Sequence, residues 1–108
     1  MNIDKLIISK NETIKRAIKA IDEGGIQFTL VVDNDRKLLG TLTDGDIRRG
    51  ILKGFNLDSQ ISHILNEKFI FVNEPNSFIK AQKLMKKYDV KHVPLLDSKG
   101  IIEKLYTE

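Results

Sequence analysis

Residues 40–49 read Gly-Thr-Leu-Thr-Asp-Gly-Asp-Ile-Arg-Arg, and this stretch marks the passage from a strand to a helix. Its first residues continue an apolar run from Leu38 to Leu42, which is typical of a strand. Thr43 then supplies a hydroxyl that can cap a helix. Asp46 places a carboxylate near the helix start, where the helix dipole favours an anion. We therefore predict a helix over about residues 46–52.

The residues before this stretch predict three further elements. A short apolar stretch at residues 6–8 indicates a strand. Apolar residues at helical spacing between positions 14 and 21 predict an amphipathic helix, capped by Thr13 and ended by Gly24-Gly25. The run 28–32 predicts another strand, and a polar turn separates it from the next one. The order is strand, helix, strand, strand, helix.

The chain repeats itself. Residues 8–33 align with residues 72–97 without a gap, at an offset of 64 (residue 97 against residue 33). After an inferred one-residue deletion the match resumes, and Thr43 falls opposite Tyr106. One unit of about 50 residues can hardly bury its own apolar faces, so we expect two units to pack sheet to sheet.

The second copy is expected to have the same elements up to its last strand. These are strands at 69–72, 93–96 and 101–105, and a helix that Ser77 caps. The final helix is missing, because the sequence stops at Glu108, as in an excised fragment. The predicted fold class is α+β, with two pseudo-symmetric β-α-β-β-α repeats, residues 1–60 and a truncated 61–108, forming one module.

Composition limits the functional classes. The chain has 108 residues, of which 41% are hydrophobic and 31% charged, as in an ordinary globular domain. It has no cysteine, no signal peptide and no apolar run long enough to span a membrane, so we expect a cytoplasmic protein. The net charge is +3, but the basic residues are spread among 15 acidic ones. Nucleic-acid binding is therefore not predicted.

The Gly-x-x-Thr-x-x-Asp pattern of residues 40–46, behind a strand–turn–strand and repeated in outline, resembles the CBS domain. The resemblance covers nearly the whole chain. It implies a disc-like module of paired repeats with clefts for adenosyl ligands, which commonly regulates an attached enzyme, channel or transporter. Residues 43–50 are also similar to tandem repeats that precede sugar-phosphate nucleotidyltransferase domains. No glycine-rich signature of that enzyme is present in this chain.

The resemblance implies an adenine-nucleotide site around Thr43 and Asp46. One carboxylate can accept bonds from both hydroxyls of a ribose, although Asp46 could equally serve as a helix-terminal charge. Thr43 would contact phosphate or ribose, or simply cap the helix. Arg48 and Arg49 are candidate phosphate ligands, but neighbours on a helix diverge by about 100°, so at most one faces a cleft.

The remaining site residues come from both repeats. Lys91 and His92, just before a proline, are expected to reach the phosphates of a nucleotide held by the first repeat. Ile8 and Ser9 would supply the adenine slot, with Ile26 and Phe28 along its wall. The second repeat has Tyr106 in place of Thr43, or Thr107 if the register slips by one residue. In either register it has no counterpart of Asp46, so we expect one competent site per chain.

Three functional hypotheses follow. The first is a non-catalytic, nucleotide-sensing regulatory module that forms a homodimer and controls an attached or partner enzyme. The second is a dimerisation scaffold without a ligand. The third is an enzyme that uses the carboxylates of Asp44 and Asp46, for which no supporting His or Cys falls at suitable spacing. No metal or catalytic cofactor is predicted.

Overall fold

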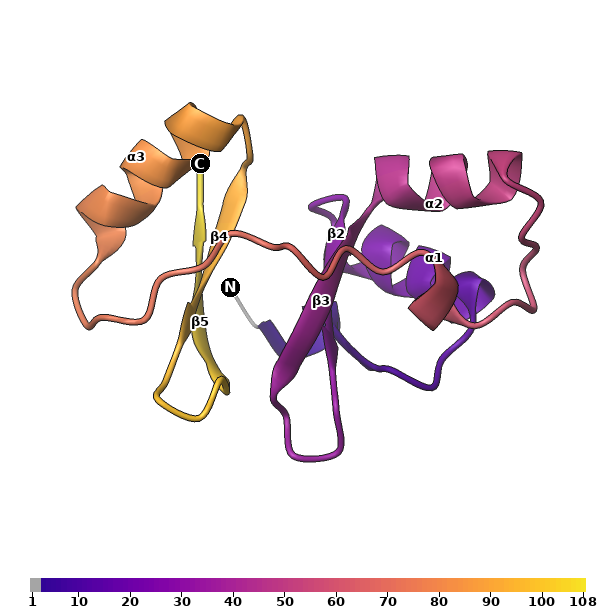
Figure 1. Cartoon of the computed structure of the whole chain (residues 1–108), viewed down its shortest axis with the longest axis horizontal. Coiled ribbons are helices and arrows are strands. Elements are labelled where there is room, and N and C mark those ends of the chain that lie inside the picture. Colours follow the sequence, from indigo (N-terminus) through magenta and orange to yellow (C-terminus); the bar gives the residue numbers. More distant parts are fainter. Residues whose placement is uncertain (1–2) are drawn as a thin grey trace.

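The computed structural model describes residues 3–108, which form two similar halves joined by a long connection (Figure 1). The first half contains η1 (Ile3–Leu6), β1 (Ile7–Ser9), α1 (Ile14–Gly24), β2 (Phe28–Val32), β3 (Leu38–Thr43) and α2 (Asp44–Leu52). The second half contains α3 (Phe78–Tyr88), β4 (His92–Leu96) and β5 (Ile102–Thr107), and η2 (Ile61–His63) lies in the connection. The predicted α+β class is confirmed, and no helix follows β5 among the described residues.

The first half is a three-stranded sheet covered by two helices. β1 runs parallel to β2, and β2 pairs antiparallel with β3. The hydroxyl of Thr13 accepts a hydrogen bond from the backbone N–H of Arg16, which caps α1 as predicted. Gly25 ends the helix in the left-handed conformation at φ 76°, where a residue without Cβ is unstrained.

The second half reproduces this plan with two differences. The predicted strand at 69–72 is wrong, because only Val72 bridges to Leu95 and the sheet has just β4 and β5. The predicted cap by Ser77 is also wrong. Ser77 has φ −97° and ψ 25° rather than the extended backbone of Thr13, so its hydroxyl makes no capping bond and is left buried without a partner.

The offset of 64 residues holds to the end of the described chain, so the predicted one-residue deletion is wrong. Phe28 stands opposite Thr43 in the first sheet, and His92 stands opposite Thr107 in the second. The two turns have equal length, and each is closed by a left-handed residue, Arg36 at φ 65° and Gly100 at φ 83°. Thr107 is therefore the counterpart of Thr43.

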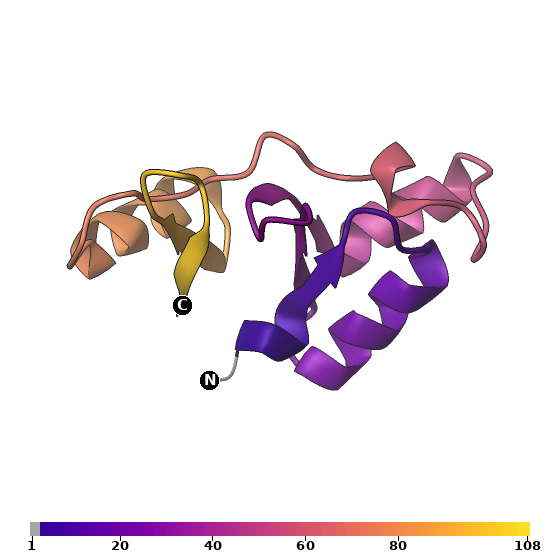
Figure 2. The ribbon, with the colours of Figure 1, turned by 90° about the horizontal axis from the view of Figure 1, so that it is seen from below.

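The repeats meet through equivalent residues. Lys37 and Ile101, which are 64 positions apart, form an antiparallel bridge. Such pairing of equivalents is what a two-fold axis between the repeats produces. Around it lies a shared cluster of apolar side chains from both sheets, comprising Leu6, Phe28, Leu30, Val32, Leu38, Leu96, Ile102 and Leu105. The predicted sheet-to-sheet packing is confirmed, with α1 and α2 outside one sheet and α3 outside the other (Figures 1 and 2).

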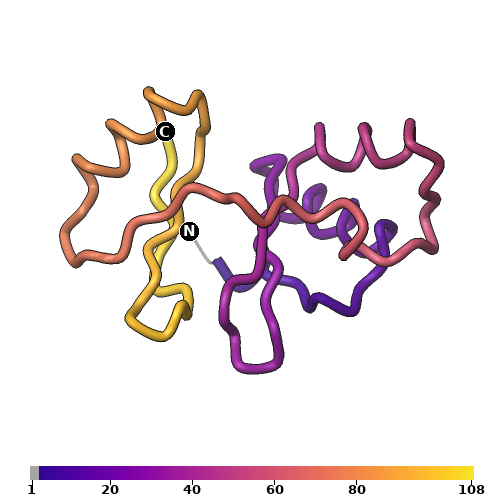
Figure 3. Tube along the Cα trace, viewed as in Figure 1, coloured from indigo at the N-terminus to yellow at the C-terminus, as the bar shows by residue number. Residues whose placement is uncertain are grey.

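The connection after α2 returns across the first repeat before it enters the second (Figure 3). Ile61 is fully buried in the core of the first repeat. Thr41 and Asn66 then exchange two backbone hydrogen bonds of 3.0 Å. Gly40 allows this close approach, because a Cβ there would lie 2.8 Å from the carbonyl oxygen of Asn66 and would collide with Leu65. A glycine at this position thus brings residues 65–70 beside β3.

Candidate functional site

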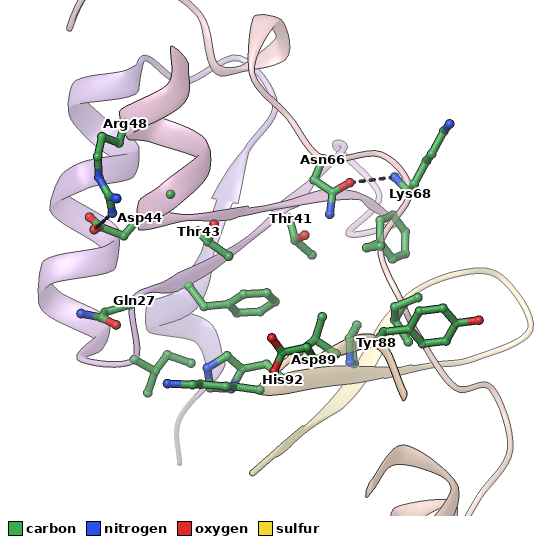
Figure 4. A pocket seen from close by; sticks show the side chains of 18 residues that line it. Gln27, Thr41, Thr43, Asp44, Arg48, Asn66, Lys68, Tyr88, Asp89 and His92 are labelled. Atoms are coloured by element: carbon green, nitrogen blue, oxygen red, sulfur yellow. Dashed lines mark hydrogen bonds and ion pairs between the residues drawn. The ribbon is translucent and has the colours of Figure 1, made fainter. Parts of the chain in front are cut away.

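A cleft of about 670 Å³ lies between the two repeats and receives residues from four segments of the chain. These are the start of β2 (Ile26, Gln27, Phe28), the β3–α2 junction (Thr41, Thr43, Asp44, Gly45, Arg48), the connection (Asn66, Lys68, Phe69, Ile70) and the approach to β4 (Tyr88, Asp89, Val90, Lys91, His92, Pro94). Figure 4 shows Thr41, Thr43 and Asn66 on one side of the cleft and His92, Asp89 and Tyr88 on the other.

A capping box fixes the junction between β3 and α2. The Thr43 hydroxyl accepts a hydrogen bond of 3.2 Å from the Asp46 N–H. Asp46 Oδ2 in turn accepts bonds from the Thr43 N–H at 2.9 Å and from the Thr43 hydroxyl at 3.1 Å. The reciprocal bonds satisfy donors that the helix start would otherwise leave unpaired. Thr43 therefore caps α2, and Asp46 is a charge at the start of this helix, which are the structural roles considered for these two residues. Thr43 also lines the cleft.

The two arginines of α2 have separate acidic partners. Arg48 lines the cleft and donates to Asp44 Oδ2 at 3.0 Å. Arg49 does not line the cleft and donates to Asp46 Oδ1 at 2.9 Å. The expectation that at most one of the two faces the cleft is confirmed. Asp44 and Asp46, the pair considered for an enzyme, are thus each held in an ion pair.

His92 and Phe28 form the contact between the repeats at the bottom of the cleft. Their ring centroids are 4.9 Å apart. Burial lowers the pKa of His92 below its ordinary value, and nearby Lys91 lowers it further, while a hydrogen bond to the Ile26 backbone opposes the shift. His92 Nδ1 is buried and has no hydrogen-bond partner among the described residues. His92 is therefore neutral at neutral pH and adds no charge for a phosphate.

The structure brings together five of the nine predicted site residues. Those lining the cleft are Phe28, Thr43, Arg48, Lys91 and His92. Asp46 and Arg49 lie beside it on α2. Ile8 is buried in the core of the first repeat, and the hydroxyl of Ser9 accepts a bond from the Asn11 N–H, so the structure does not bring these two residues to the cleft.

The connecting segment takes the place that Ile8 and Ser9 were expected to fill. Asn66, Phe69 and Ile70 line the cleft, and the Asn66 carboxamide oxygen accepts a bond from the Lys68 N–H at 3.1 Å. The side chain of Lys68 points away from the centre of the cleft (Figure 4). Sequence reasoning missed this segment because a return across β3 leaves no local pattern. Gly40 was the available signal, since a glycine inside a strand indicates close backbone approach.

The second repeat has a different concavity. It measures about 540 Å³ and is lined by Asn76, Phe78, Ile79, Lys104, Leu105, Tyr106 and Thr107. Ile14, the equivalent of Phe78, is fully buried, whereas Phe78 is 47% exposed because no described helix covers it.

Among residues 3–108, no group of acidic, His or Cys side chains is arranged to hold a metal ion. Within the same residues, no helix is both long enough and apolar enough to cross a membrane.

Comparison with known proteins places this geometry in context. Residues 1–53 and 61–105 match the family model described as "CBS domain". A CBS domain-containing protein of Dictyostelium discoideum is 30% identical over 104 residues, which cover 86% of this chain and 72% of that protein. The arabinose 5-phosphate isomerase KdsD of Francisella tularensis is 31% identical over 93 residues, which cover 85% of this chain and only 28% of the isomerase.

Solved structures show the same fold. The cytosolic domain of the Mg²⁺ channel MgtE, determined in complex with ATP, superposes with a TM-score of 0.78 over 94% of this chain and 41% of that one. The two sequences are 20% identical, so this likeness concerns the fold alone.

Proposed function

This chain belongs to the CBS domain family, and from that premise we propose that its cleft binds an adenine nucleotide as a regulatory ligand. The observation that carries the proposal is that Thr43 of the first repeat and Lys91 of the second repeat line the same cleft. Its volume of about 670 Å³ lies within the usual range for small-molecule sites, about 300–1,000 Å³.

Each part of a nucleotide has a suitable environment. Ile26, Phe28 and Ile70 offer apolar surface to the base, and the Asn66 carboxamide offers hydrogen bonds. Thr43 and Asp46 would receive the ribose at the start of α2. Lys91 and Arg48 carry the positive charge for a phosphate, provided that Arg48 exchanges its partner Asp44 for the ligand. A protein of the same fold, the cytosolic domain of MgtE, was solved in complex with ATP, which supports this class of ligand.

Calorimetry with AMP tests the assignment. Asp46→Ala is expected to weaken binding about ten- to a hundredfold, because it removes a charge-assisted contact of about 1.5–3 kcal/mol. Asp22→Ala is the control, since it removes an exposed carboxylate of the first repeat, on α1, that does not line the cleft. Equal affinity of the wild type and Asp46→Ala would refute the ribose assignment. Failure of AMP, ADP and ATP to bind the wild type would favour the scaffold without a ligand.

We propose that ligand binding controls an enzyme, either attached to this module or separate from it. In the isomerase the matched region is 28% of the chain, so a module of this kind is joined there to further polypeptide. The likeness of residues 43–50 to repeats before sugar-phosphate nucleotidyltransferases makes such an enzyme the preferred partner. Its activity, measured with this module present, should change when AMP is added.

We also propose that two chains associate through the helices of the first repeat. Ile18 of α1 and Ile51 and Leu52 of α2 are 40%, 42% and 81% exposed, and the two helices contact each other. Apolar side chains exposed on neighbouring helices are a suitable surface for a second copy. Light scattering after size-exclusion chromatography should give the mass of a dimer. A monomer at high concentration would exclude it.

A further inference from the structure

The carboxylate of Asp46 is already largely occupied by the protein itself. A carboxylate has about four acceptor positions on its two oxygens. Oδ2 accepts two bonds from Thr43, through its N–H and its hydroxyl. Oδ1 accepts a third bond, from Arg49 Nη2 at 2.9 Å. One acceptor position therefore remains, whereas the two neighbouring hydroxyls of a ribose require two.

The occupant that can leave is Arg49. The two bonds from Thr43 belong to the capping box and hold the start of α2. The Arg49 side chain is 65% exposed, and the carboxylate that it contacts is 20% exposed. An ion pair with one exposed partner contributes little to stability, so it can be exchanged for a ligand at small cost.

Arg49 also lies against a residue that lines the cleft. A Cβ built on Gly45 would be 3.0 Å from Nη1 and 3.3 Å from Nη2 of Arg49, so the guanidinium lies over Gly45. Gly45 itself lines the cleft. The absence of a side chain at this position lets Arg49 fold back along the first turn of α2 to reach Asp46.

We propose that Arg49 is an internal competitor that holds the acceptor on Asp46 needed by the second ribose hydroxyl. The module consequently binds ribonucleosides more weakly, and distinguishes ribose from 2′-deoxyribose less well, than its carboxylate permits. This inference rests on the proposed binding of ribose by Asp46. It assigns Arg49 a role opposite to that of a phosphate ligand.

Calorimetry with adenosine and 2′-deoxyadenosine tests the proposal, because neither probe has a phosphate for Arg49 to bind. Arg49→Met keeps the aliphatic stem and removes the donor. It is expected to raise the affinity for adenosine about two- to fivefold, the usual strength of an exposed ion pair, and to leave 2′-deoxyadenosine unchanged. The ratio of the two affinities therefore rises.

Lys53→Met is the matched control. Lys53 is an exposed cation at the C-terminal cap of the same helix and does not line the cleft, so its replacement changes the same charge without freeing Asp46. The affinity ratio should stay at the wild-type value. Gly45→Ala keeps the charge of Arg49 but crowds its guanidinium, so it should change the ratio in the same direction as Arg49→Met and by less.

The outcomes separate the two proposals. If the wild type binds adenosine and Arg49→Met leaves the ratio unchanged or lowers it, the competitor role is wrong and the ribose site stands. A rise of the ratio in Lys53→Met equal to that in Arg49→Met would also refute the role, because charge alone would explain it. If no variant binds adenosine, 2′-deoxyadenosine or AMP, the ribose site is absent and both proposals fall.

Discussion

Phe28 and His92 are equivalent residues of the two repeats, 64 positions apart, and their rings lie against each other with centroids 4.9 Å apart and planes tilted by 40°. Each begins the first strand of its antiparallel pair. Contact between equivalent residues locates the two-fold relation at the bottom of the cleft. In this contact His92 Nδ1 is buried without a partner among residues 3–108, so the interface between the repeats carries a titratable group.

Stability should fall with decreasing pH because of His92. Burial lowers the pKa of His92 in the folded chain below the ordinary value of 6.5, so between these two values the unfolded chain binds more protons. The contribution of His92 is therefore complete above pH 6.5 and is lost as the pH falls toward the folded pKa. We expect His92→Phe to flatten this dependence in urea unfolding, because it removes the titratable ring from the contact between the repeats.

The control for this experiment is His63→Phe. His63 is exposed and stacks on Phe55 within the first repeat, away from the contact with His92. Its replacement removes a histidine without changing the interface between the repeats. The assignment of the pH dependence of stability to His92 would be wrong if His63→Phe flattened this dependence as much as His92→Phe, or if His92→Phe left it unchanged.

Gly40→Ala should destabilise the chain and weaken AMP binding together. The added Cβ would lie 2.8 Å from the carbonyl oxygen of Asn66 and against Leu65, so the connecting segment would have to leave β3. We expect a loss of about 2 kcal/mol in the free energy of unfolding, as for other overpacked sites. In Gly45→Ala the added Cβ meets only the flexible end of Arg49, and this variant should be as stable as the wild type. Wild-type stability of Gly40→Ala would contradict the close approach.

Local patterns were sufficient to predict part of the site and the regular elements, except for the predicted strand at 69–72, which does not form. Thr13, Thr43 and Gly25 act within one or two turns of their own positions, and each has the predicted role at a helix end. The register of the second repeat was not predictable from apolar matches, because Leu38 fits Ile101 and Ile102 equally well. The closing residues of the two turns decide it, and Arg36 gives no sign in sequence of a left-handed backbone like that of Gly100.

Tertiary contacts explain what sequence reasoning missed in the cleft. Asn66 reaches the site through bonds to Thr41, 25 positions earlier, and no spacing rule connects the two. The neighbours Arg48 and Arg49 look alike in sequence. They are distinguished by the acidic residue each can reach, Asp44 at i−4 and Asp46 at i−3.

The helix caps of the two repeats should respond differently to the same change. Thr13→Ala removes the bond to the Arg16 N–H and is expected to cost about 1 kcal/mol in chemical denaturation. Ser77→Ala, at the equivalent position, removes a buried hydroxyl that has no partner, so it should be neutral or stabilising. If Ser77→Ala cost as much as Thr13→Ala, the Ser77 hydroxyl would have to be capping α3, and the difference described between the repeats would be wrong.

Lys91 should contribute to binding only when the ligand has a phosphate. It lines the cleft from the second repeat and is exposed, so its contact with a phosphate is expected to be worth about two- to fivefold in affinity. Lys91→Ala should weaken AMP by that factor and leave adenosine unchanged in calorimetry. Lys104→Ala is the control, because Lys104 is an exposed lysine of the same repeat that lines the other concavity.

The same calorimetric titrations with AMP give the number of nucleotide sites per chain. Thr107 is the register equivalent of Thr43, but none of the described residues that line the concavity beside it is acidic. The concavity beside Thr107 therefore has no carboxylate placed for a ribose, and we expect one AMP per chain. Two AMP molecules of similar affinity per chain would show that the carboxylate is dispensable, and equal losses for AMP and adenosine in Lys91→Ala would show that Lys91 holds the nucleoside rather than the phosphate.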